Sequence, residues 1–273
     1  MIKKTWYGPV LQLEMARLFE GKPVYTMACY YVDGLLIDTG PVHVSDEIEE
    51  AFKDLPVNII VNTHHHEDHI GNNIVFQQKR GVEKILAHYK AVERIQRPET
   101  WIQRLRAYQH IAWGSPPPSK AQVIGETVET ANYQFKVIHT PGHSDDHICL
   151  LEPKKGWLFS GDIFIREELK TLRSDENFHE ILASLYKLYQ YEFSTIFCGS
   201  GKIIMKDAKK ALKQKIEYFE RIKEEIFALY DKDKDIEEIT RQVLGEESVL
   251  YGPTEGDFGK INLVKSVLTG SEC

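Results

Sequence analysis

The hydrophobic pattern at the start of the chain predicts a meander of β-strands. Apolar residues dominate residues 10–14 and 24–32, and the second run ends at Asp33-Gly34, a dipeptide typical of hairpin turns. A third short run, residues 35–37, ends at the polar segment 38–40. We therefore expect strands joined by tight turns in this region.

Beyond residue 40, short apolar runs alternate with amphipathic stretches. Residues 45–52 are predicted to form a helix with Ser45 as its N-cap, since acidic residues occupy the first turn. Residues 57–61 form a short, mainly apolar run, typical of a strand covered on both faces. Further strands are expected at 84–87, 133–139, 157–161 and 195–199, with helices at about 73–80 and 175–189. This alternation predicts a large α/β domain over residues 1–205.

Two segments depart from this alternation. Residues 90–113 are helical in composition and lead into the triple proline 116–118, so we interpret about 88–118 as a helical insertion. After residue 205, apolar residues at helical spacing predict a long helix, followed by short helices at 236–244 and 262–268. We interpret residues 206–273 as a C-terminal helical extension packed on the main domain.

A cluster of ionisable residues follows the strand predicted at 57–61. Its members are His64, His65, His66, Glu67, Asp68 and His69. Because residues i and i+2 face the same side of extended backbone, His64 and His66 can reach one metal ion. Asp68 and His69 would serve a neighbouring ion or a metal-bound water, whereas His65 and Glu67 are expected to point elsewhere. Imidazole and carboxylate suit zinc, and also iron or manganese; the alternative is a solvated histidine-rich loop.

Residues 63–69 resemble the HxHxDH signature of the metallo-β-lactamase superfamily. Three further blocks match that family's motifs in the expected order: LLIDTG at 35–40, HTPGHS at 139–144 and FSGD at 159–162. The resemblance covers about residues 20–205. It implies an αββα sandwich, in which two β-sheets are flanked by helices and the metals lie at one edge.

The resemblance also implies a role for each matching residue. The residues that it implies as metal ligands are His64, His66 and His143 for a first ion, Asp68 and His69 for a second, and Asp162 as a bridge. Asp38 is implied to be structural, through hydrogen bonds in the metal-site loops, and His147 to support its loop. The cofactor expected from this set is one or two zinc ions per chain, with iron or manganese as alternatives.

One position departs from the family's pattern. The turn after the last core strand carries Ser200 where the family usually has a histidine. A neutral hydroxyl is a poor ligand, so the second site is expected to be weak, loaded with another metal, or empty. Cys198, His110 or His179 could supply the missing ligand, and Ser200 and Lys202 are candidates for a second-site or substrate contact that stabilises an oxyanion.

These residues predict hydrolysis by a metal-activated water. Three neutral histidines leave an open coordination position, where a metal lowers the pKa of water towards about 7. Asp68 is placed to accept the proton or to orient the nucleophile. The expected substrate is a small ester, thioester, lactone or related compound. The alternatives are a phosphodiesterase, a mononuclear iron oxygenase using His64, His143 and Asp162, and a non-catalytic binding protein.

Composition limits the partners that we expect. The chain of 273 residues has a net charge of −7, which disfavours binding to nucleic acid. It has no apolar run of about 18 residues and no signal-peptide pattern at its start. The four cysteines, Cys29, Cys149, Cys198 and Cys273, are scattered, which favours free thiols. We expect a cytoplasmic protein that acts on a small molecule away from membranes, with homodimer formation left open.

Overall fold

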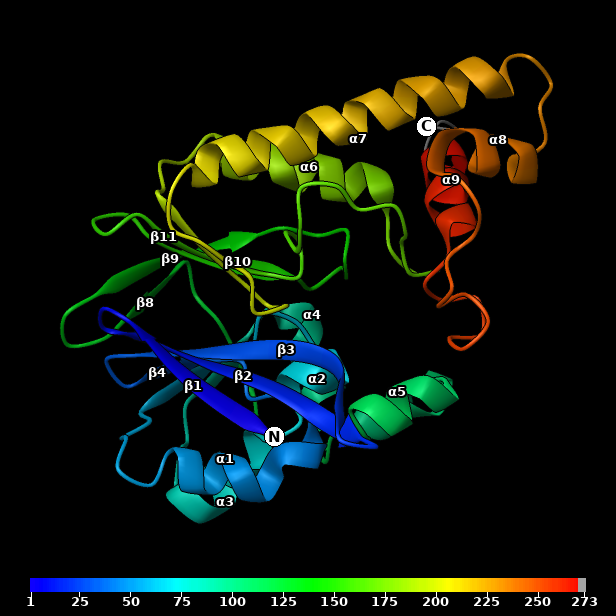
Figure 1. Ribbon diagram of the computed structural model, residues 1–273. Helices are drawn as coiled ribbons and strands as arrows, with labels where there is room; N and C mark the ends of the chain where they lie inside the picture. The colour runs from blue at the N-terminus through cyan, green and yellow to red at the C-terminus, as the bar shows by residue number, and fades with distance from the viewer. Residues whose placement is uncertain (270–273) are drawn as a thin grey trace.

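The structure is a computed structural model that describes residues 1–269, the side chain of Phe19 excepted, so Cys273 lies outside the described residues. In the described part of the chain, two β-sheets pack face to face and helices cover both outer faces (Figure 1). The predicted αββα sandwich is therefore confirmed. The sheets differ in how their strands run, and this difference places the functional loops.

The first sheet has the strand order β1-β2-β3-β4-β5-β6-β7. Its strands are β1 (Ile2–Tyr7), β2 (Val10–Phe19), β3 (Lys22–Val32), β4 (Leu35–Ile37), β5 (Ile59–Val61), β6 (Ile85–Ala87) and β7 (Gln122–Val123). Strands β1 to β4 pair antiparallel, as the meander predicted, and β4 to β7 pair parallel. Because β4, β5 and β6 run in the same direction, the loops that follow them emerge at the same edge.

The second sheet has the strand order β13-β12-β11-β10-β9-β8. Its strands are β8 (Thr127–Glu129), β9 (Gln134–His139), β10 (Ile148–Glu152), β11 (Trp157–Gly161), β12 (Thr195–Cys198) and β13 (Ile203–Ile204). Strands β11 and β12 pair parallel and the other neighbours pair antiparallel. Three of these strands, β8, β10 and β13, had not been predicted from the hydrophobic pattern.

Strand β3 shows how the sequence builds two cores at once. Ala28, Tyr30 and Val32 belong to the core between the two sheets. The residues in between, Met27, Cys29 and Tyr31, belong to the core beneath the outer helices. Successive side chains of a strand point to opposite faces, so a continuous apolar run serves both layers.

The outer face of the first sheet is covered by α1 (Ser45–Ala51), α3 (Asn73–Arg80) and α4 (Tyr89–Gln96). The N-cap prediction for α1 was wrong by one residue. Val44 is the N-cap, and the Ser45 hydroxyl donates to Val42 O at 2.7 Å and contacts Asn72. Ser45 therefore joins α1 to the loop before α3 instead of capping the helix.

The outer face of the second sheet is covered by α6 (Phe178–Tyr189) and α7 (Ala208–Tyr230), and α8 (Ile236–Leu244) and α9 (Lys260–Thr269) pack beside them (Figure 1). Side chains of these four helices share one continuous core with β10, β11 and β12. The segment interpreted as an extension therefore supplies the outermost layer of the sandwich, and no break in the core separates it from residues 1–205.

A lysine is buried in this layer. Lys215 of α7 is 1% exposed, and its Nζ lies 5.4 Å from the ring centroids of Phe164 and Phe219. Burial lowers the pKa of this ammonium group to about 8, because the charged form loses its hydration in the apolar layer.

The predicted insertion connects β6 to β7 and is not one helix. It consists of α4, two 3-10 turns (Pro98–Thr100 and Ile102–Arg104) and α5 (Ala107–Ala112). Pro98 opens the first turn, since proline lacks the N–H that would continue α4. Tyr108 of α5 and Trp113, which follows the helix, pack on Tyr25 of β3, and Tyr108 also contacts Phe258, which precedes α9.

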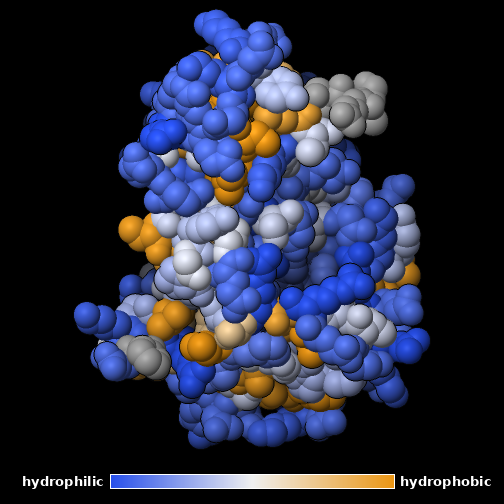
Figure 2. All heavy atoms as spheres, turned by 90° about the vertical axis from the view of Figure 1, so that its right-hand side faces the viewer, coloured by the Kyte–Doolittle hydropathy of each residue, from blue (hydrophilic) through white to orange (hydrophobic). Residues whose placement is uncertain are grey.

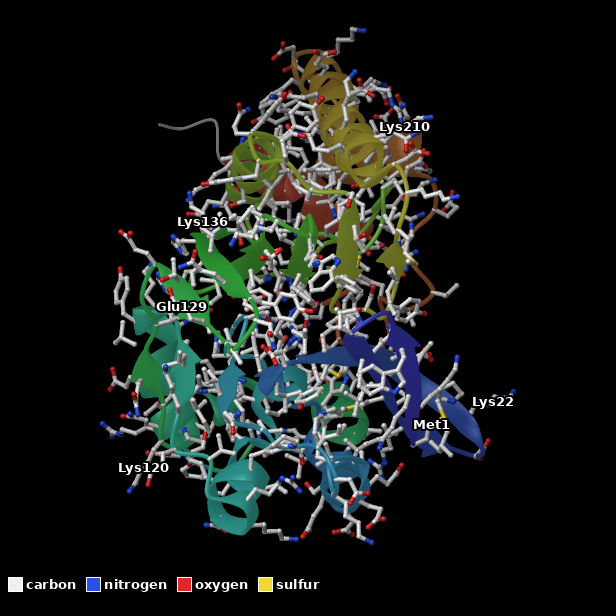
Figure 3. All side chains as sticks on the ribbon, turned by 90° about the vertical axis from the view of Figure 1, so that its left-hand side faces the viewer. Met1, Lys22, Lys120, Glu129, Lys136 and Lys210 are labelled. Carbon is white, nitrogen blue, oxygen red and sulfur yellow. The ribbon has the colours of Figure 1, made fainter. Side chains whose placement is uncertain are left out.

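The charged residues lie mostly on the surface. Figure 3 shows Lys22, Lys120, Lys136 and Lys210 at the periphery, and Figure 2 shows a largely hydrophilic face with apolar groups in small patches. Cys29, Cys149 and Cys198 are free and buried. Within residues 1–269, we find no helix with the length and apolar character that crossing a bilayer requires.

Candidate metal centre

The residues predicted to bind metal meet at one edge of the sandwich. His64 and His66 lie in the loop after β5, and Asp68 and His69 lie in the short helix α2 (Glu67–Ile70) that follows. His143 comes from the loop between β9 and β10, and Asp162 directly follows β11. Loops from both sheets therefore build the centre, at the carboxyl ends of β5 and β11, where α/β proteins usually form their sites.

Three imidazole nitrogens converge on one point. His66 Nδ1 lies 3.0 Å from His64 Nε2 and 3.0 Å from His143 Nε2. Two nitrogens bound to one tetrahedral zinc ion at about 2.05 Å lie roughly 3.4 Å apart. The spacing of the three nitrogens thus fits a single ion of this size, and the group meets the geometry of a metal site.

Neighbouring oxygens set the orientation of these rings. The Thr63 hydroxyl donates to Asp38 Oδ2 at 2.8 Å and lies 3.0 Å from His64 Nδ1. Since its proton is given to Asp38, the hydroxyl accepts from His64 Nδ1–H. His143 Nδ1 is bonded in the same way to Glu176 Oε1 at 2.6 Å. Both rings then carry a lone pair on Nε2, the atom that faces His66.

A second group of donors lies next to the first. His69 Nδ1 is bonded to Asp38 Oδ2 at 2.7 Å, so the neutral form of this ring, which a metal ion would bind, carries its lone pair on Nε2. That nitrogen is buried and has no hydrogen-bond partner within the described residues. It lies 3.6 Å from both Asp68 Oδ2 and Asp162 Oδ2. A buried acceptor between two carboxylates is what a second cation would satisfy, and His64, His69 and Asp162 together form a group with metal-site geometry.

The electrostatics of the centre favour bound positive charge. Burial raises the pKa of Asp68 to about 7, and the neighbouring Glu67 and Asp162 add to this while His69 opposes it. Burial alone would lower the pKa of His69, but Asp38, Asp68 and Asp162 raise it well above its ordinary value. The pKa of Asp162 is lowered against burial by His69 and His143. A cation bound among these buried carboxylates would therefore stabilise their charged forms.

His147 supports the backbone that presents Asp162. Its Nε2 accepts from the backbone N–H of Asp162 at 3.0 Å, and its Nδ1 lies 2.8 Å from the Thr140 hydroxyl. Burial lowers the pKa of His147 to about 3, and the neighbouring His143 contributes, so the ring stays neutral and keeps its acceptor. Through these contacts His147 links Thr140, at the end of β9, to the turn that carries Asp162.

Gly199 makes room for the Asp162 carboxylate. A Cβ at position 199 would lie 2.1 Å from Asp162 Oδ1. The backbone of the turn after β12 therefore packs directly on this carboxylate. Ser200, the next residue, lines the same cavity as Asp68 and Asp162, beside the second group of donors.

The other candidates for a second-site contact lie elsewhere. Lys202 pairs with Glu167 at 2.5 Å and lines neither of the cavities at the centre, so the structure does not support a substrate contact from it. The exposed His110 bonds to Ser115, and His179 Nε2 bonds to Val267 O. Cys198 is a buried strand residue in which burial raises the thiol pKa to about 12. The last three residues are absent from both donor groups among the described residues.

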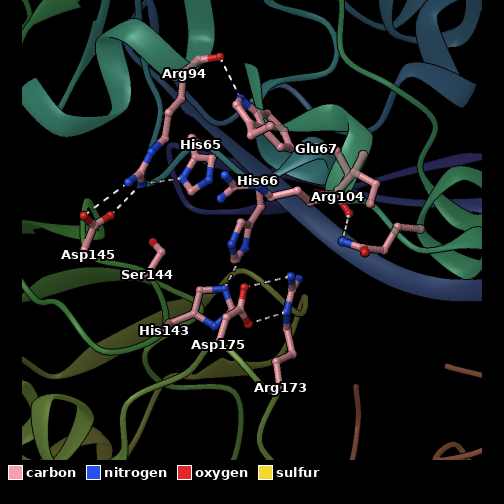
Figure 4. Close-up of a pocket in the computed structure, with 13 residues that line it drawn as sticks. His65, His66, Glu67, Arg94, Arg104, His143, Ser144, Asp145, Arg173 and Asp175 are labelled. Carbon is pink, nitrogen blue, oxygen red and sulfur yellow. Dashed lines mark hydrogen bonds and ion pairs between the residues drawn. The ribbon is translucent and has the colours of Figure 1, made fainter. Parts of the chain in front are cut away.

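Two cavities adjoin the centre, and His66 and His143 line both. We call the first, of about 320 Å³, the arginine cavity (Figure 4). Its lining consists of His65, His66, Glu67, Arg94, Trp101, Arg104, Leu105, Gln109, His143, Ser144, Asp145, Arg173 and Asp175. The second, of about 350 Å³, we call the aromatic cavity, since Tyr25, Trp113 and Phe258 form part of its wall together with Asp68, Asp162 and Ser200.

Residues around the three nitrogens differ in how far the sequence indicated their place. His65 points away from the three nitrogens, as expected, and bonds to Asp146 at 3.0 Å. Glu67 was also expected to point elsewhere, and it is absent from both donor groups but lines the arginine cavity. Glu176 and the arginines of the cavity had no local signal, because the fold alone brings them to the centre.

Comparison with known proteins identifies the family of this chain. The model of the metallo-beta-lactamase superfamily matches residues 28–200. The chain belongs to this superfamily. A metallo-beta-lactamase family protein from Thermus thermophilus has a solved structure that superposes with a TM-score of 0.66 at 18% identity, covering 95% of this chain and 91% of that one. This likeness supports the fold.

The curated relatives of this superfamily member include hydrolases. A beta-lactamase-like protein 2 homolog from Caenorhabditis elegans is 27% identical over 86% of this chain and 73% of its own length. A hydroxyacylglutathione hydrolase from Legionella pneumophila (strain Corby) is 32% identical over 40% of this chain and 34% of its own length. The thioesterase pkgB from Emericella nidulans is 29% identical over 63% of this chain and 43% of its own length. The chain thus spans less than half of the latter two. Together with the histidine-rich site, these relatives support a metallohydrolase.

Proposed function

We propose that this chain hydrolyses a small ester, thioester or lactone with a metal-activated water, using one or two zinc ions. The observation that carries the proposal is the convergence of His64 Nε2, His66 Nδ1 and His143 Nε2 beside the carboxyl group of Asp68. The names of the hydroxyacylglutathione hydrolase and the thioesterase favour a thioester among these substrates.

The chain's own residues divide the work of such a reaction. His64, His66 and His143 would hold the first ion, and Asp68, His69 and Asp162 the second. A zinc ion, when bound, supplies a lowered pKa for water and positive charge for a developing oxyanion. Asp68 accepts the proton of the attacking water, because its carboxylate lines the aromatic cavity together with His66 and His143.

Other residues of the proposed site position the reacting groups. Asp38 and Glu176 keep the protons of the imidazoles on the nitrogens that face away from the centre. Ser200 lines the aromatic cavity and donates a hydrogen bond to the oxyanion, in place of a fourth ligand for the second ion. The aromatic wall restricts the entry of bulk water to the reacting carbonyl.

The proposal is tested by metal content and hydrolysis together. Protein purified without added metal or chelator is analysed by elemental mass spectrometry and assayed with acetyl thioesters, aryl esters, lactones and phosphodiesters. His66→Ala is expected to lose most metal and all hydrolysis, whereas His110→Ala, which removes an exposed histidine, keeps both. Unchanged metal in His66→Ala would overturn the first site. A zinc-loaded protein that cleaves none of the esters would overturn the hydrolase, and one iron per chain with oxygen consumption would replace it with an oxygenase.

A further inference from the structure

The arginine cavity gives a substrate arm a place next to the reacting centre. His66 and His143 line this cavity and the aromatic cavity alike. A substrate whose reacting carbonyl lies at the centre can therefore extend one arm into each. The two walls differ in chemistry, because one is rich in arginines and the other in aromatic rings.

Two of the three arginines in the arginine cavity are neutralised within its wall. Both terminal nitrogens of Arg94 bond to Asp145, at 2.5 and 3.2 Å. Arg173 is bonded through Nε and Nη2 to the two carboxylate oxygens of Asp175, at 3.2 and 3.3 Å. Figure 4 shows both two-pronged pairs. Arginines paired in this way are already bound to an anion and serve mainly to shape the wall.

Arg104 is different. It ends the second 3-10 turn of the insertion, its side chain is exposed, and no hydrogen bond or ion pair joins that side chain to any other described residue. The nearby acid Glu67 is fully buried, is held by Gln109 at 2.8 Å, and forms no ion pair with Arg104. Its second carboxylate oxygen has no partner within residues 1–269. The wall of the arginine cavity therefore contains one guanidinium group, that of Arg104, with which none of the acids of the wall forms a pair.

We propose that the substrate carries an oxyanion group, either a carboxylate or a phosphate, on the arm that enters the arginine cavity, and that Arg104 binds this group. This inference rests on the proposed hydrolase function and narrows its substrates to anionic esters or thioesters. A guanidinium offers parallel N–H donors that match the oxygens of a carboxylate or a phosphate. The anion also fits a centre whose bound cations add positive charge on the adjoining side.

The test compares substrates that differ only in the charge of one arm. The probes are the acetyl thioesters of 3-mercaptopropionate, of the neutral 3-mercaptopropionamide and of 2-mercaptoethyl phosphate. The wild type should cleave an anionic thioester with a kcat/KM about tenfold above that of the amide, a modest factor because Arg104 is exposed to solvent. The preference should shrink as salt is added. The carboxylate and phosphate probes together identify which oxyanion the cavity accepts.

Arg104→Gln should remove this preference through a higher KM, with kcat unchanged. Arg97→Gln is the matched control, since Arg97 is an exposed arginine of the same insertion that lies outside the cavity. An equal preference in Arg104→Gln and in the wild type, or no preference in the wild type, would overturn the subsite while leaving the hydrolase intact.

A binding measurement separates the subsite from the hydrolase. The thioether analogues of the same three arms, which cannot be cleaved, are titrated into the metal-loaded protein by calorimetry. Tighter binding of the anionic thioether that depends on Arg104, in a protein that cleaves none of the thioesters, esters and lactones, would support the subsite and reject the hydrolase. Equal binding of the anionic and neutral thioethers would reject the subsite.

Discussion

The buried Lys215 should make the stability of this protein depend on pH in the alkaline range. Its ammonium group lies among apolar side chains of the outer layer, 5.4 Å from two phenylalanine ring centroids, and Glu176 and Glu167 are the nearby acids that oppose the effect of burial. A lysine with a lowered pKa binds a proton less tightly in the folded state than in the unfolded state. Folding is therefore least favoured while both states are protonated.

The size of the effect follows from the two pKa values. A fall from 10.5 to about 8 corresponds to about 3 kcal/mol, at 1.36 kcal/mol per pKa unit. Between pH 8 and 10.5 the unfolded state holds more protons at this site, so the contribution of Lys215 becomes more favourable as pH rises. Below pH 8 the full cost is present.

Substitution of this lysine isolates its contribution. Lys215→Met gives an unbranched side chain one atom shorter than lysine with no charge to bury, so it should be more stable than the wild type at pH 7. Its advantage should fall by about 3 kcal/mol between pH 7 and 10.5. Urea unfolding at pH 7, 8, 9 and 10 measures the difference, with Lys213→Met as the control, since Lys213 is exposed on the same helix. A difference that is constant over this range would refute the reasoning, because Lys215 would then keep an ordinary pKa.

Three further changes test the centre itself. Glu176→Ala removes the acceptor of His143 Nδ1 and should weaken metal binding about 10- to 100-fold, measured by competition with a chelator, whereas equal affinity would mean that Glu176 does not orient the ring. Gly199→Ala should displace the Asp162 carboxylate, since the new Cβ would lie 2.1 Å from Oδ1. In protein saturated with excess zinc, which fills the second site of the wild type, we expect Gly199→Ala to keep only the first ion in elemental analysis, and two retained ions would contradict this. Ser200→His should raise the metal content towards two ions per chain, and an unchanged content would show that position 200 is not beside the second site.

Much of the fold could be predicted because its signals are local. Each of the strands β3, β5 and β11 comes from an apolar run, and a motif lies within a few residues of the end of each run. The hydrophobic period and the ligand spacing can therefore be used together. Strand β1 was missed because its charged residues interrupt the apolar run of an edge strand. Residues 90–113 were expected to be helical from their composition, but composition did not show that Pro98 divides the segment into separate helical pieces.

The surroundings of the centre could not be predicted in the same way. Glu176 bonds to a histidine 33 positions earlier, and the arginine cavity combines residues near 65, 100, 145 and 175. No periodicity connects such positions, because the loops that carry them belong to different layers. Ion pairs could not be predicted from the sequence either. Whether Arg104 is unpaired depends on which acids Arg94 and Arg173 bind in the folded chain.

A single carboxylate serves both halves of the metal centre. Asp38 bonds directly to His69 and, through Thr63, determines which nitrogen of His64 carries the proton. Engineering that changes metal selectivity at only one of the two sites must therefore leave Asp38 untouched and act on Glu176, which bonds to His143, or on Ser200, which lines the cavity beside the second group of donors. The two groups of donors thus share one hydrogen-bond acceptor, Asp38, and each has a further neighbour that can be substituted separately.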